Sequence, residues 1–360
     1  MAAPLGHPST WPDVESSMHG FPFPELATCR EVIVPRREAA EDPDLIVLPG
    51  GLTFYLQRRR LATSLFGAVI HGIKGHCSDP DQPSTFLMPR RPRDQTHVAV
   101  KRSSLEEMRR TPQENVFREI SVMRYLSEGG GHPYVMPLVA ACISETHVYV
   151  VTPFFGGGDL LKMVVPDRGT GEQNARRWFQ QILGGLSYIH GKQGLCHHDF
   201  SPENVVISGN GDAAVVMDFG MVQRMPRGSF GEVVEMRDAY RFGKLRYMSP
   251  EIWDNREYDG RQADIWSAGV TLLVCLLGEY LWMAPTRIPA EELEIYSSDI
   301  YSYSIVEDHG AGMMLERLRF TSRMSVAAAD LVCHMLVVDR GLRPSSAEML
   351  LQHPFFVAHL

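Results

Sequence analysis

The sequence has little cysteine, no excess of positive charge and no long apolar run. Six cysteines are scattered through 360 residues without a C-x-x-C pair, which argues against a disulfide framework and favours a reducing, intracellular and cytoplasmic compartment. The formal net charge of −8 gives no general electrostatic case for a nucleic acid or an anionic membrane as partner. The most apolar run, Ser267–Leu277, is too short to span a bilayer and stops at Gly278, so we expect a buried helix there.

The first part of the chain, residues 1–47, is rich in proline and has few apolar residues at regular spacing. Segments of this kind bury too little apolar surface to order themselves, so we expect a loosely ordered extension. Within this extension, a packed strand around Glu31–Pro35 is an alternative interpretation. From residue 48 the sequence becomes strand-like, and we place the start of the main domain there.

Residues 196–220 gather the groups best suited to chemistry. Asp199 and Asn204 lie five residues apart around a proline, which stops a helix from forming between them. Two apolar runs separated by a turn sequence at 208–212 then lead to Asp218, so we expect a hairpin that returns Asp218 to the neighbourhood of Asp199. Two carboxylates and an amide oxygen are hard ligands of the kind Mg²⁺ prefers, and such an ion often shares its shell with phosphates.

This stretch resembles the catalytic loop (H-R-D-x-x-x-x-N) and the D-F-G motif of eukaryotic protein kinases. The matching residues are His197-His198-Asp199, Asn204 and Asp218-Phe219-Gly220. The resemblance implies that Asp199 orients the substrate hydroxyl and accepts its proton, while Asn204 and Asp218 hold Mg²⁺. It also implies an α+β, two-lobed protein kinase fold over residues 48–360, with a small β-rich N-lobe (48–152), a hinge (153–158) and a larger, mainly helical C-lobe (159–360).

Other parts of the family pattern follow in the expected order. The alternating run that ends at Lys101 resembles the strand whose lysine contacts the ATP phosphates. Glu119, eighteen residues later within a helical pattern over 112–126, matches the carboxylate that holds this lysine. Further matches are the S-P-E ending at Glu251, the D-I-W-S-A-G beginning at Asp264, and Arg343, which the family pairs with the glutamate of S-P-E.

The resemblance implies ATP as cofactor together with Mg²⁺, and it assigns residues to the nucleotide. The glycine-rich turn of the family corresponds to residues 61–69, where only one of the three family glycines is present. We expect a turn here whose backbone has less conformational freedom than in the family. The hinge would present a carbonyl oxygen from Pro153 and an N–H from Phe155 to the adenine. The full set expected to contact the nucleotide is Leu61, Gly67, Val69, Ala99, Lys101, Thr152, Pro153, Phe155, Asp159 and Val206.

Two stretches of the expected N-lobe are less regular. Residues 71–95 form an insertion relative to the family hairpin, which we interpret as a solvated loop or, alternatively, as a docking site for an acidic partner. Residues 134–141 and 147–151 are predicted to be two strands.

Three departures from the family pattern lie near Asp199. His198 replaces the arginine that usually receives an activation-loop phosphate, which argues against activation by such a phosphate. Ser201 replaces a lysine, and Lys244 replaces a threonine at the position that faces it in the family fold. We hypothesise a swap in which Lys244, as a catalytic residue, supplies the positive charge that Ser201 no longer gives.

The implied activity is that of a protein serine/threonine kinase, which transfers the γ-phosphoryl group of ATP to hydroxyl groups of protein substrates. The Y-M-S-P-E ending and the lack of a tyrosine-kinase-like A-A-R sequence favour serine and threonine as acceptors. The alternative is a pseudokinase that acts as an ATP-binding scaffold or allosteric partner, supported by the altered glycine-rich turn. The presence of Lys101, Glu119, Asp199, Asn204 and Asp218 favours the enzyme, and the oligomeric state is not indicated.

Overall fold

The chain divides into two compact units in a computed structural model. The structure describes residues 18, 20–32, 45–78, 86–87, 89, 91–110, 115–237, 243–280, 282, 312, 315–316 and 320–357. The first unit comprises Met1–Gly131 and Met136–Phe155, and the second comprises His132–Val135 and Gly156–Leu360. The division after Phe155 falls inside the segment 153–158 that the sequence predicts to be the hinge.

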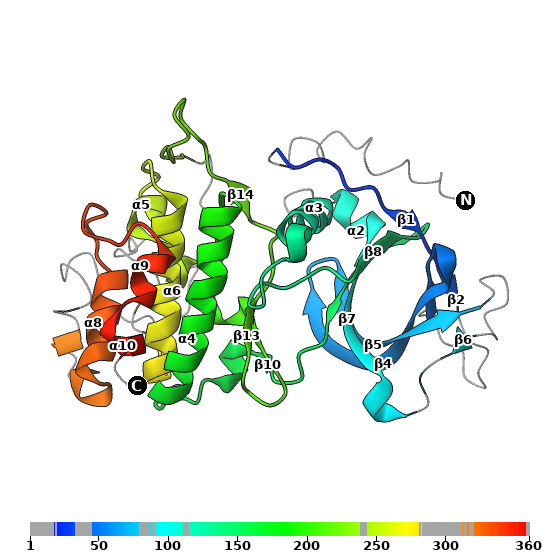
Figure 1. Cartoon of the computed structure of the whole chain (residues 1–360), viewed down its shortest axis with the longest axis horizontal. Coiled ribbons are helices and arrows are strands. Elements are labelled where there is room, and N and C mark those ends of the chain that lie inside the picture. Colours follow the sequence, from blue (N-terminus) through cyan, green and yellow to red (C-terminus); the bar gives the residue numbers. More distant parts are fainter. Residues whose placement is uncertain are drawn as a thin grey trace. The chain divides into compact units, whose positions relative to one another are not determined.

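A strongly curved sheet forms the frame of the first unit (Figure 1). Within the described residues its nine strands pair in the order β1-β8-β9-β7-β5-β4-β3-β2, with β6 on β5. β1 is parallel to β8, and every other pairing in this sheet is antiparallel. The strands are β1 Ala27–Thr28, β2 Arg30–Val32, β3 Leu45–Val47, β4 Leu52–Ser64, β5 Gly67–Cys77, β6 Phe86–Leu87, β7 Thr96–Ser104, β8 Ala140–Ile143 and β9 His147–Pro153.

The expectation of a loosely ordered extension is wrong for the described part of residues 1–47. Residues 20–32, which we name the N-terminal strap, lead into the sheet as β1 and β2 on either side of Cys29. Because β1 pairs with β8 and β2 with β3, the strap joins the two ends of the strand order. β3 also precedes residue 48, so the sheet begins earlier than predicted. Residues 33–44, and with them most of the alternative strand at 31–35, lie outside the described part.

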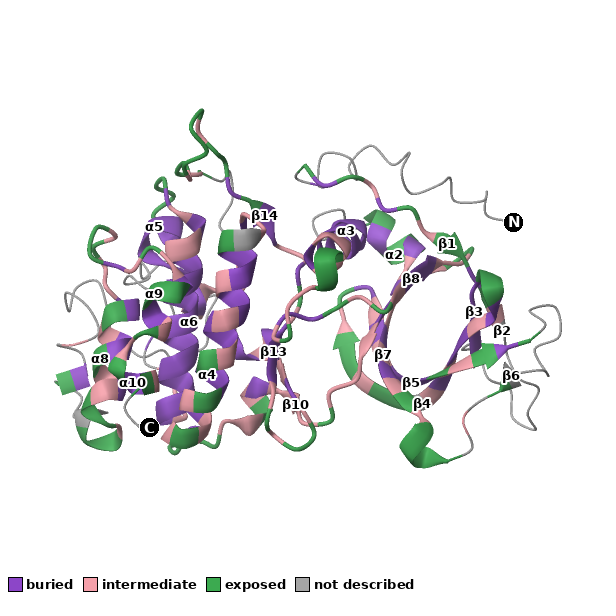
Figure 2. Ribbon diagram, viewed as in Figure 1, coloured by how far each residue is buried: buried purple, intermediate pink, exposed green. Residues whose placement is uncertain are grey.

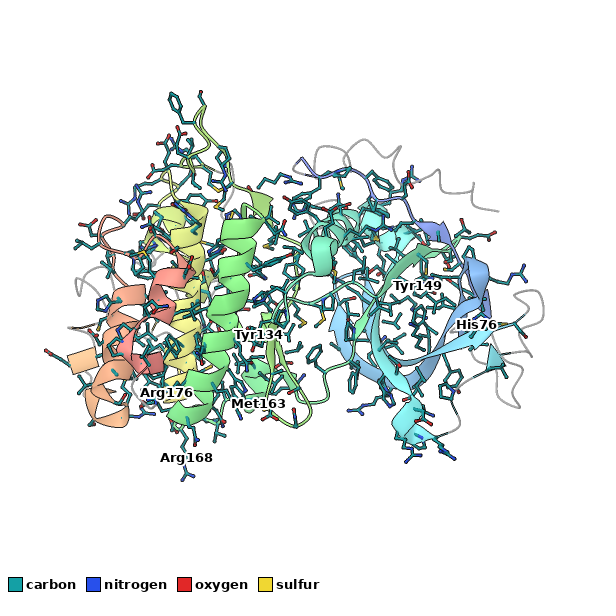
Figure 3. All side chains as sticks on the ribbon, viewed as in Figure 1. His76, Tyr134, Tyr149, Met163, Arg168 and Arg176 are labelled. Atoms are coloured by element: carbon teal, nitrogen blue, oxygen red, sulfur yellow. The ribbon has the colours of Figure 1, made fainter. Side chains whose placement is uncertain are left out.

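The core of the first unit lies inside the curve of the sheet. Phe54, Val98 and Tyr149, from three different strands, are completely buried in one cluster, and Figure 3 shows Tyr149 in the hollow of the sheet. Burying a large apolar side chain contributes about 1.5–3 kcal/mol to stability. Cys29 belongs to the same cluster, so the N-terminal strap is part of the core of this unit.

Two helices follow β7, namely α2 (Leu105–Arg110) and α3 (Val116–Ser127). α3 is the helix predicted over 112–126, and residues 111–114 lie outside the described part. It begins at Asn115, whose side-chain oxygen accepts hydrogen bonds from the N–H groups of Phe117 (2.9 Å) and Arg118 (3.2 Å). An asparagine cap of this kind satisfies N–H groups that have no partner within the helix. The apolar residues of the predicted pattern are all buried, namely Val116, Ile120, Met123 and Leu126.

Two sequence predictions for this unit need correction. The strand expected over 134–141 begins only at Ala140, because prolines at 133 and 137 remove backbone donors that a ladder needs. The insertion expected over 71–95 is partly strand, since residues 71–77 continue β5 and residues 86–87 form β6. The strand predicted over 147–151 is present as β9.

The second unit is mainly helical. Its long helices α4 (Glu172–Ser187) and α6 (Gly260–Leu277) contact each other, and Figure 2 shows α6 buried along nearly its whole length. The prediction of a buried helix at 267–277 is therefore confirmed, and in the described part of the chain no helix is long and apolar enough to cross a membrane. The other described α-helices and strands are α5 Pro250–Trp253, α8 Val326–Met335, α9 Ala347–Leu351, α10 Pro354–Val357, β10 Gly158–Asp159, β11 Leu195–Cys196, β12 Val205–Ile207, β13 Ala214–Val216 and β14 Gln223–Arg224.

A buried ion pair joins α5 to the segment before α9. The Arg343 guanidinium donates to both carboxylate oxygens of Glu251, at 2.6 and 3.1 Å, and the two side chains are 0% and 1% exposed. Its remaining donors reach the carbonyl oxygens of Val337 and Gln262, and the group lies over the ring of Trp266. The predicted pairing of Arg343 with Glu251 is confirmed.

We expect Arg343→Met to lower the free energy of unfolding by about 3–5 kcal/mol, because it leaves the Glu251 carboxylate buried without its partner. The matched control is Arg340→Met, which breaks an ion pair with Glu235 whose side chains are 30% and 48% exposed. The control should cost less than about 1 kcal/mol. Urea unfolding measures both values, and equal costs would contradict this account of the pair.

A second prediction concerns Glu31, the residue that anchors the N-terminal strap to β9. Its carboxylate accepts hydrogen bonds from Ser144 Oγ and from Tyr149 Oη (2.7 Å), and His147 Nδ1 lies 3.4 Å away. The hydrogen bond from His147, followed by those from Ser144 and Tyr149, outweighs burial and lowers the pKa of Glu31 to about 2. A lowered pKa stabilises the folded state above the unfolded pKa, and this contribution disappears as the pH falls through the folded pKa.

We therefore expect Glu31→Gln to lower the free energy of unfolding by about 2 kcal/mol at pH 7. The difference from the unmodified chain should shrink as the pH falls from 4.5 towards 2. Denaturant unfolding at pH 7, 5 and 3 tests this, with the exposed Glu25→Gln as a control that should show little difference at any pH. A difference that is constant across this range would refute the role of the Glu31 charge.

Candidate active site

In the first unit an ion pair joins β7 to α3. Lys101 Nζ donates to Glu119 Oε2 at 2.7 Å, and the two side chains are 25% and 9% exposed. Strand β7 places Lys101, while the helical spacing of the apolar face of α3 turns Glu119 towards the sheet. The sequence predicted this juxtaposition, and the structure has it.

The altered glycine-rich turn lies between β4 and β5. Ser64 pairs with Gly67, so Leu65 and Phe66 form the turn itself. Gly67 has a φ of 156°, and a Cβ atom added there would lie 2.3 Å from the carbonyl oxygen of Arg102. The one glycine that remains in this stretch is therefore the one whose position excludes any side chain.

The other nucleotide residues predicted in this unit lie on neighbouring strands. Val69 on β5 pairs with Lys101, and Ala99 on β7 pairs with Thr152 on β9. β9 ends at Pro153, and Phe155 follows two residues later, at the end of the unit. Leu61 lies on β4, ahead of the turn. The curved sheet thus brings Val69, Ala99 and Lys101 into adjacent positions.

In the second unit a buried carboxylate, Asp264 at the start of α6, holds the loop that carries Asp199. Its oxygens accept hydrogen bonds from the backbone N–H groups of His197 (2.6 Å) and His198 (2.9 Å) and from His190 Nε2 (2.8 Å). Burial alone would raise the pKa of Asp264, but the hydrogen bond and charge of His190 and the nearby histidines lower it. His198 adopts a φ of 65°, a conformation that a side chain tolerates only where its surroundings enforce it.

The same loop brings together Asp199 and Asn204. Asn204 Nδ2 donates to the backbone oxygen of Asp199 (2.7 Å) and to Asp199 Oδ2 (3.0 Å). Burial raises the pKa of the Asp199 carboxyl, with a further contribution from Asp218, and this outweighs the opposing effects of Lys244, His197 and Asn204.

Asp218 follows β13, which pairs with β12 after Asn204, so the predicted hairpin is present. His197 Nε2 donates to the carbonyl oxygen of Met217 (3.1 Å), which ties the end of this hairpin to the catalytic loop. The donor set fits Mg²⁺: the amide nitrogen of Asn204 is occupied by Asp199, so the oxygen is the atom left for a metal, and Asp218 adds an exposed carboxylate.

Lys244 lies where the sequence hypothesis puts it. Its Nζ donates to Ser201 Oγ at 2.6 Å and lies 3.6 Å from Asp199 Oδ2 and 3.8 Å from Glu203 Oε2. Its backbone N–H donates to Asp199 Oδ1 (3.2 Å). The juxtaposition of Lys244, Ser201 and Asp199 is therefore present in the structure, and the part that Lys244 plays in catalysis stays a prediction.

His198 differs from an arginine in more than charge. The side chain is buried, and its Nε2 lies 3.1 Å from Tyr258 Oη and 3.3 Å from Cys196 Sγ. The imidazole is thus directed into the interior of the unit. The sequence did not indicate Tyr258, which belongs to no motif, or Glu203, which occupies a variable position of the catalytic-loop motif.

Two predicted nucleotide residues of this unit, Asp159 and Val206, are partners in the pairing of β10 with β12. Both carboxylate oxygens of Asp159 are engaged, since Oδ1 accepts from the N–H of Lys162 (3.1 Å) and Oδ2 from Lys162 Nζ (2.6 Å). Asp159 therefore caps the turn that follows it, and binding of a ribose would compete with Lys162.

Comparison with known proteins agrees with this geometry. The protein kinase domain model matches residues 85–356, beginning beyond the glycine-rich turn, and the chain belongs to the protein kinase family. It is 38% identical to the serine/threonine-protein kinase SAPK4 of Oryza sativa subsp. japonica over 169 residues, which cover 46% of this chain and 43% of the relative.

Two Arabidopsis thaliana proteins are also similar. CBL-interacting serine/threonine-protein kinase 16 is 33% identical over 223 residues, 61% of this chain and 43% of the relative. Serine/threonine-protein kinase SRK2I is 31% identical over 248 residues, 69% of this chain and 62% of the relative. The match thus spans less than half the length of the first two relatives described here.

A double-mutant cycle tests the swap of Ser201 and Lys244. We expect Lys244→Thr to lower kcat about 10- to 100-fold, because it removes the cation beside Asp199. Ser201→Lys alone should also be impaired, because it places a second ammonium group against Lys244. The double variant should recover most of the loss, since one cation again faces Asp199. A double variant no more active than the worse single variant would contradict the swap.

Proposed function

We propose that this protein is a serine/threonine kinase that transfers the γ-phosphoryl group of ATP to hydroxyl groups of protein substrates. The observation that carries the proposal is the pairing of Asp199 with Asn204 on a loop held by Asp264, with Lys244 from a later segment beside Asp199. Such a set suits phosphoryl transfer, in which catalysis is mainly positioning and charge stabilisation.

Each residue has a role that follows from its chemistry. Asp199 accepts a hydrogen bond from the substrate hydroxyl, orients its oxygen and takes its proton as transfer proceeds. Asn204 and Asp218 would hold Mg²⁺, and this ion, when bound with ATP, neutralises charge on the phosphates. Lys101, kept in place by Glu119, supplies a positive charge for the phosphates. Lys244 supplies a second positive charge beside Asp199.

The remaining nucleotide contacts are proposed from the same pattern. Pro153 and Phe155 would offer a backbone carbonyl and an N–H to the adenine, while Thr152 borders it. The apolar side chains of Val69, Ala99 and Val206 would cover the ring faces, with Leu61 and Gly67 at the turn and Asp159 at the ribose.

Protein hydroxyls are the proposed acceptors, in line with the names of the similar plant kinases. The six cysteines, all within the described residues, form no disulfide, which supports a reducing intracellular setting that we take to be the cytoplasm.

Incubation of the purified chain with labelled ATP, Mg²⁺ and generic protein substrates tests the proposal. We expect label on serine and threonine, and a loss of at least about 100-fold in Asp218→Asn, because an amide is a poorer Mg²⁺ ligand than a carboxylate. Binding of ATP without transfer would replace the proposal by the pseudokinase alternative. Label on tyrosine alone would show that the acceptor is tyrosine and not serine or threonine.

A further inference from the structure

The N-terminal strap lies on the outer face of α3. Ser121 Oγ donates to the carbonyl oxygen of Pro22 (2.7 Å), and Arg124 Nη2 donates to that of Glu25 (2.6 Å). The ring of Phe23 packs on Phe117 with centroids 4.8 Å apart. Figure 1 shows the strap, in dark blue, passing α3 before it reaches β1.

Contacts at both ends of α3 extend this face. The ring of Phe21 lies edge-on to Tyr125, in the last turn of the helix, with centroids 6.3 Å apart. At the first turn, Asn115 Nδ2 donates to the sulfur of Met18, just ahead of the strap. Met18 and Phe21 are 3% and 4% exposed, so these contacts are buried.

The strap and Glu119 lie on opposite sides of the helix. With about 100° per residue, Ser121 and Arg124 project within roughly 40° of Phe117, whereas Glu119 projects roughly 200° away. The strap therefore holds α3 from the side away from the sheet, and Glu119 faces Lys101 on the other side.

The strap is also bonded to the sheet that carries Lys101. Beyond Glu25 it pairs with β8 and β3, and Cys29 enters the core. Glu31 is bonded to Tyr149 on β9, the strand next to β7. One continuous segment thus contacts both the helix of Glu119 and the sheet of Lys101.

We propose that the N-terminal strap is a positioning element for the Lys101–Glu119 ion pair. It fixes the distance between α3 and the sheet, so the carboxylate stays within reach of the lysine. This inference rests on the proposed function, because the ion pair matters to activity only if Lys101 serves phosphoryl transfer.

The test uses the full-length chain and the variant Phe23→Ala. We expect kcat to fall about tenfold, because α3 moves and the ion pair loosens. KM for the protein substrate should stay within about twofold, because the variant leaves the residues around Asp199 unchanged. Phe23→Leu, which keeps an apolar body against Phe117, should recover most of the loss. Thr28→Ala, an exposed change in the strand part of the strap, should leave kcat within about twofold.

Combining Phe23→Ala with Glu119→Gln distinguishes an effect on the position of Glu119 from a general loss of stability. If the strap acts through Glu119, Phe23→Ala should lower kcat by less than about twofold in the Glu119→Gln background. An equal tenfold loss in both backgrounds, or no loss in the unmodified chain, would overturn the proposal.

Hydrogen exchange gives a second readout that does not depend on catalysis. Amides of α3 should exchange faster in Phe23→Ala, while those of α6 in the other unit stay unchanged. Unaltered exchange in α3 overturns the positioning role even if the chain transfers phosphate. If the α3 amides exchange faster but the unmodified chain transfers no phosphate, the proposed kinase activity is overturned. The strap would then position α3 without a role in catalysis.

Discussion

The loop that carries Asp199 depends on one buried carboxylate, that of Asp264. Its oxygens accept hydrogen bonds from the N–H groups of His197 and His198 and from a ring nitrogen of His190. These three bonds leave the loop little freedom to move. Removal of such a charge from water is costly, and hydrogen bonds to the ionised form offset that cost. Because Asp264 lies near the start of α6, a helix buried along nearly its whole length, the position of Asp199 follows from the core of the second unit.

At the three positions that depart from the family pattern, the side chains contact groups of the chain itself. His198 is bonded to Tyr258 and Cys196 in the interior, and Lys244 places its cation against Ser201 and Asp199. The N-terminal strap holds α3 in the same way. The proposed active arrangement therefore rests on internal contacts in both units.

Local motifs predicted much of the candidate site, whereas segments without periodicity escaped prediction. Lys101 and Glu119 could be paired from the sequence, because both match positions of the kinase pattern, and regular apolar spacing predicted the helix that carries Glu119. The strap could not, since a two-residue parallel pairing between Ala27 and Cys142 has no local pattern and joins distant parts of the chain. Asp159 shows a third case, because the pattern that proposes it for the ribose does not reveal that Lys162, three residues later, also binds its carboxylate.

The most direct test of this account is the activity of the chain freed of phosphate. Purified protein would be treated with a phosphatase, verified by mass spectrometry to carry no phosphate, and assayed at once for initial phosphoryl transfer to a protein substrate. The account predicts an initial rate within about twofold of the untreated protein, because internal contacts hold the catalytic loop and α3. A rate that falls tenfold or more and returns on rephosphorylation of the activation segment would contradict it.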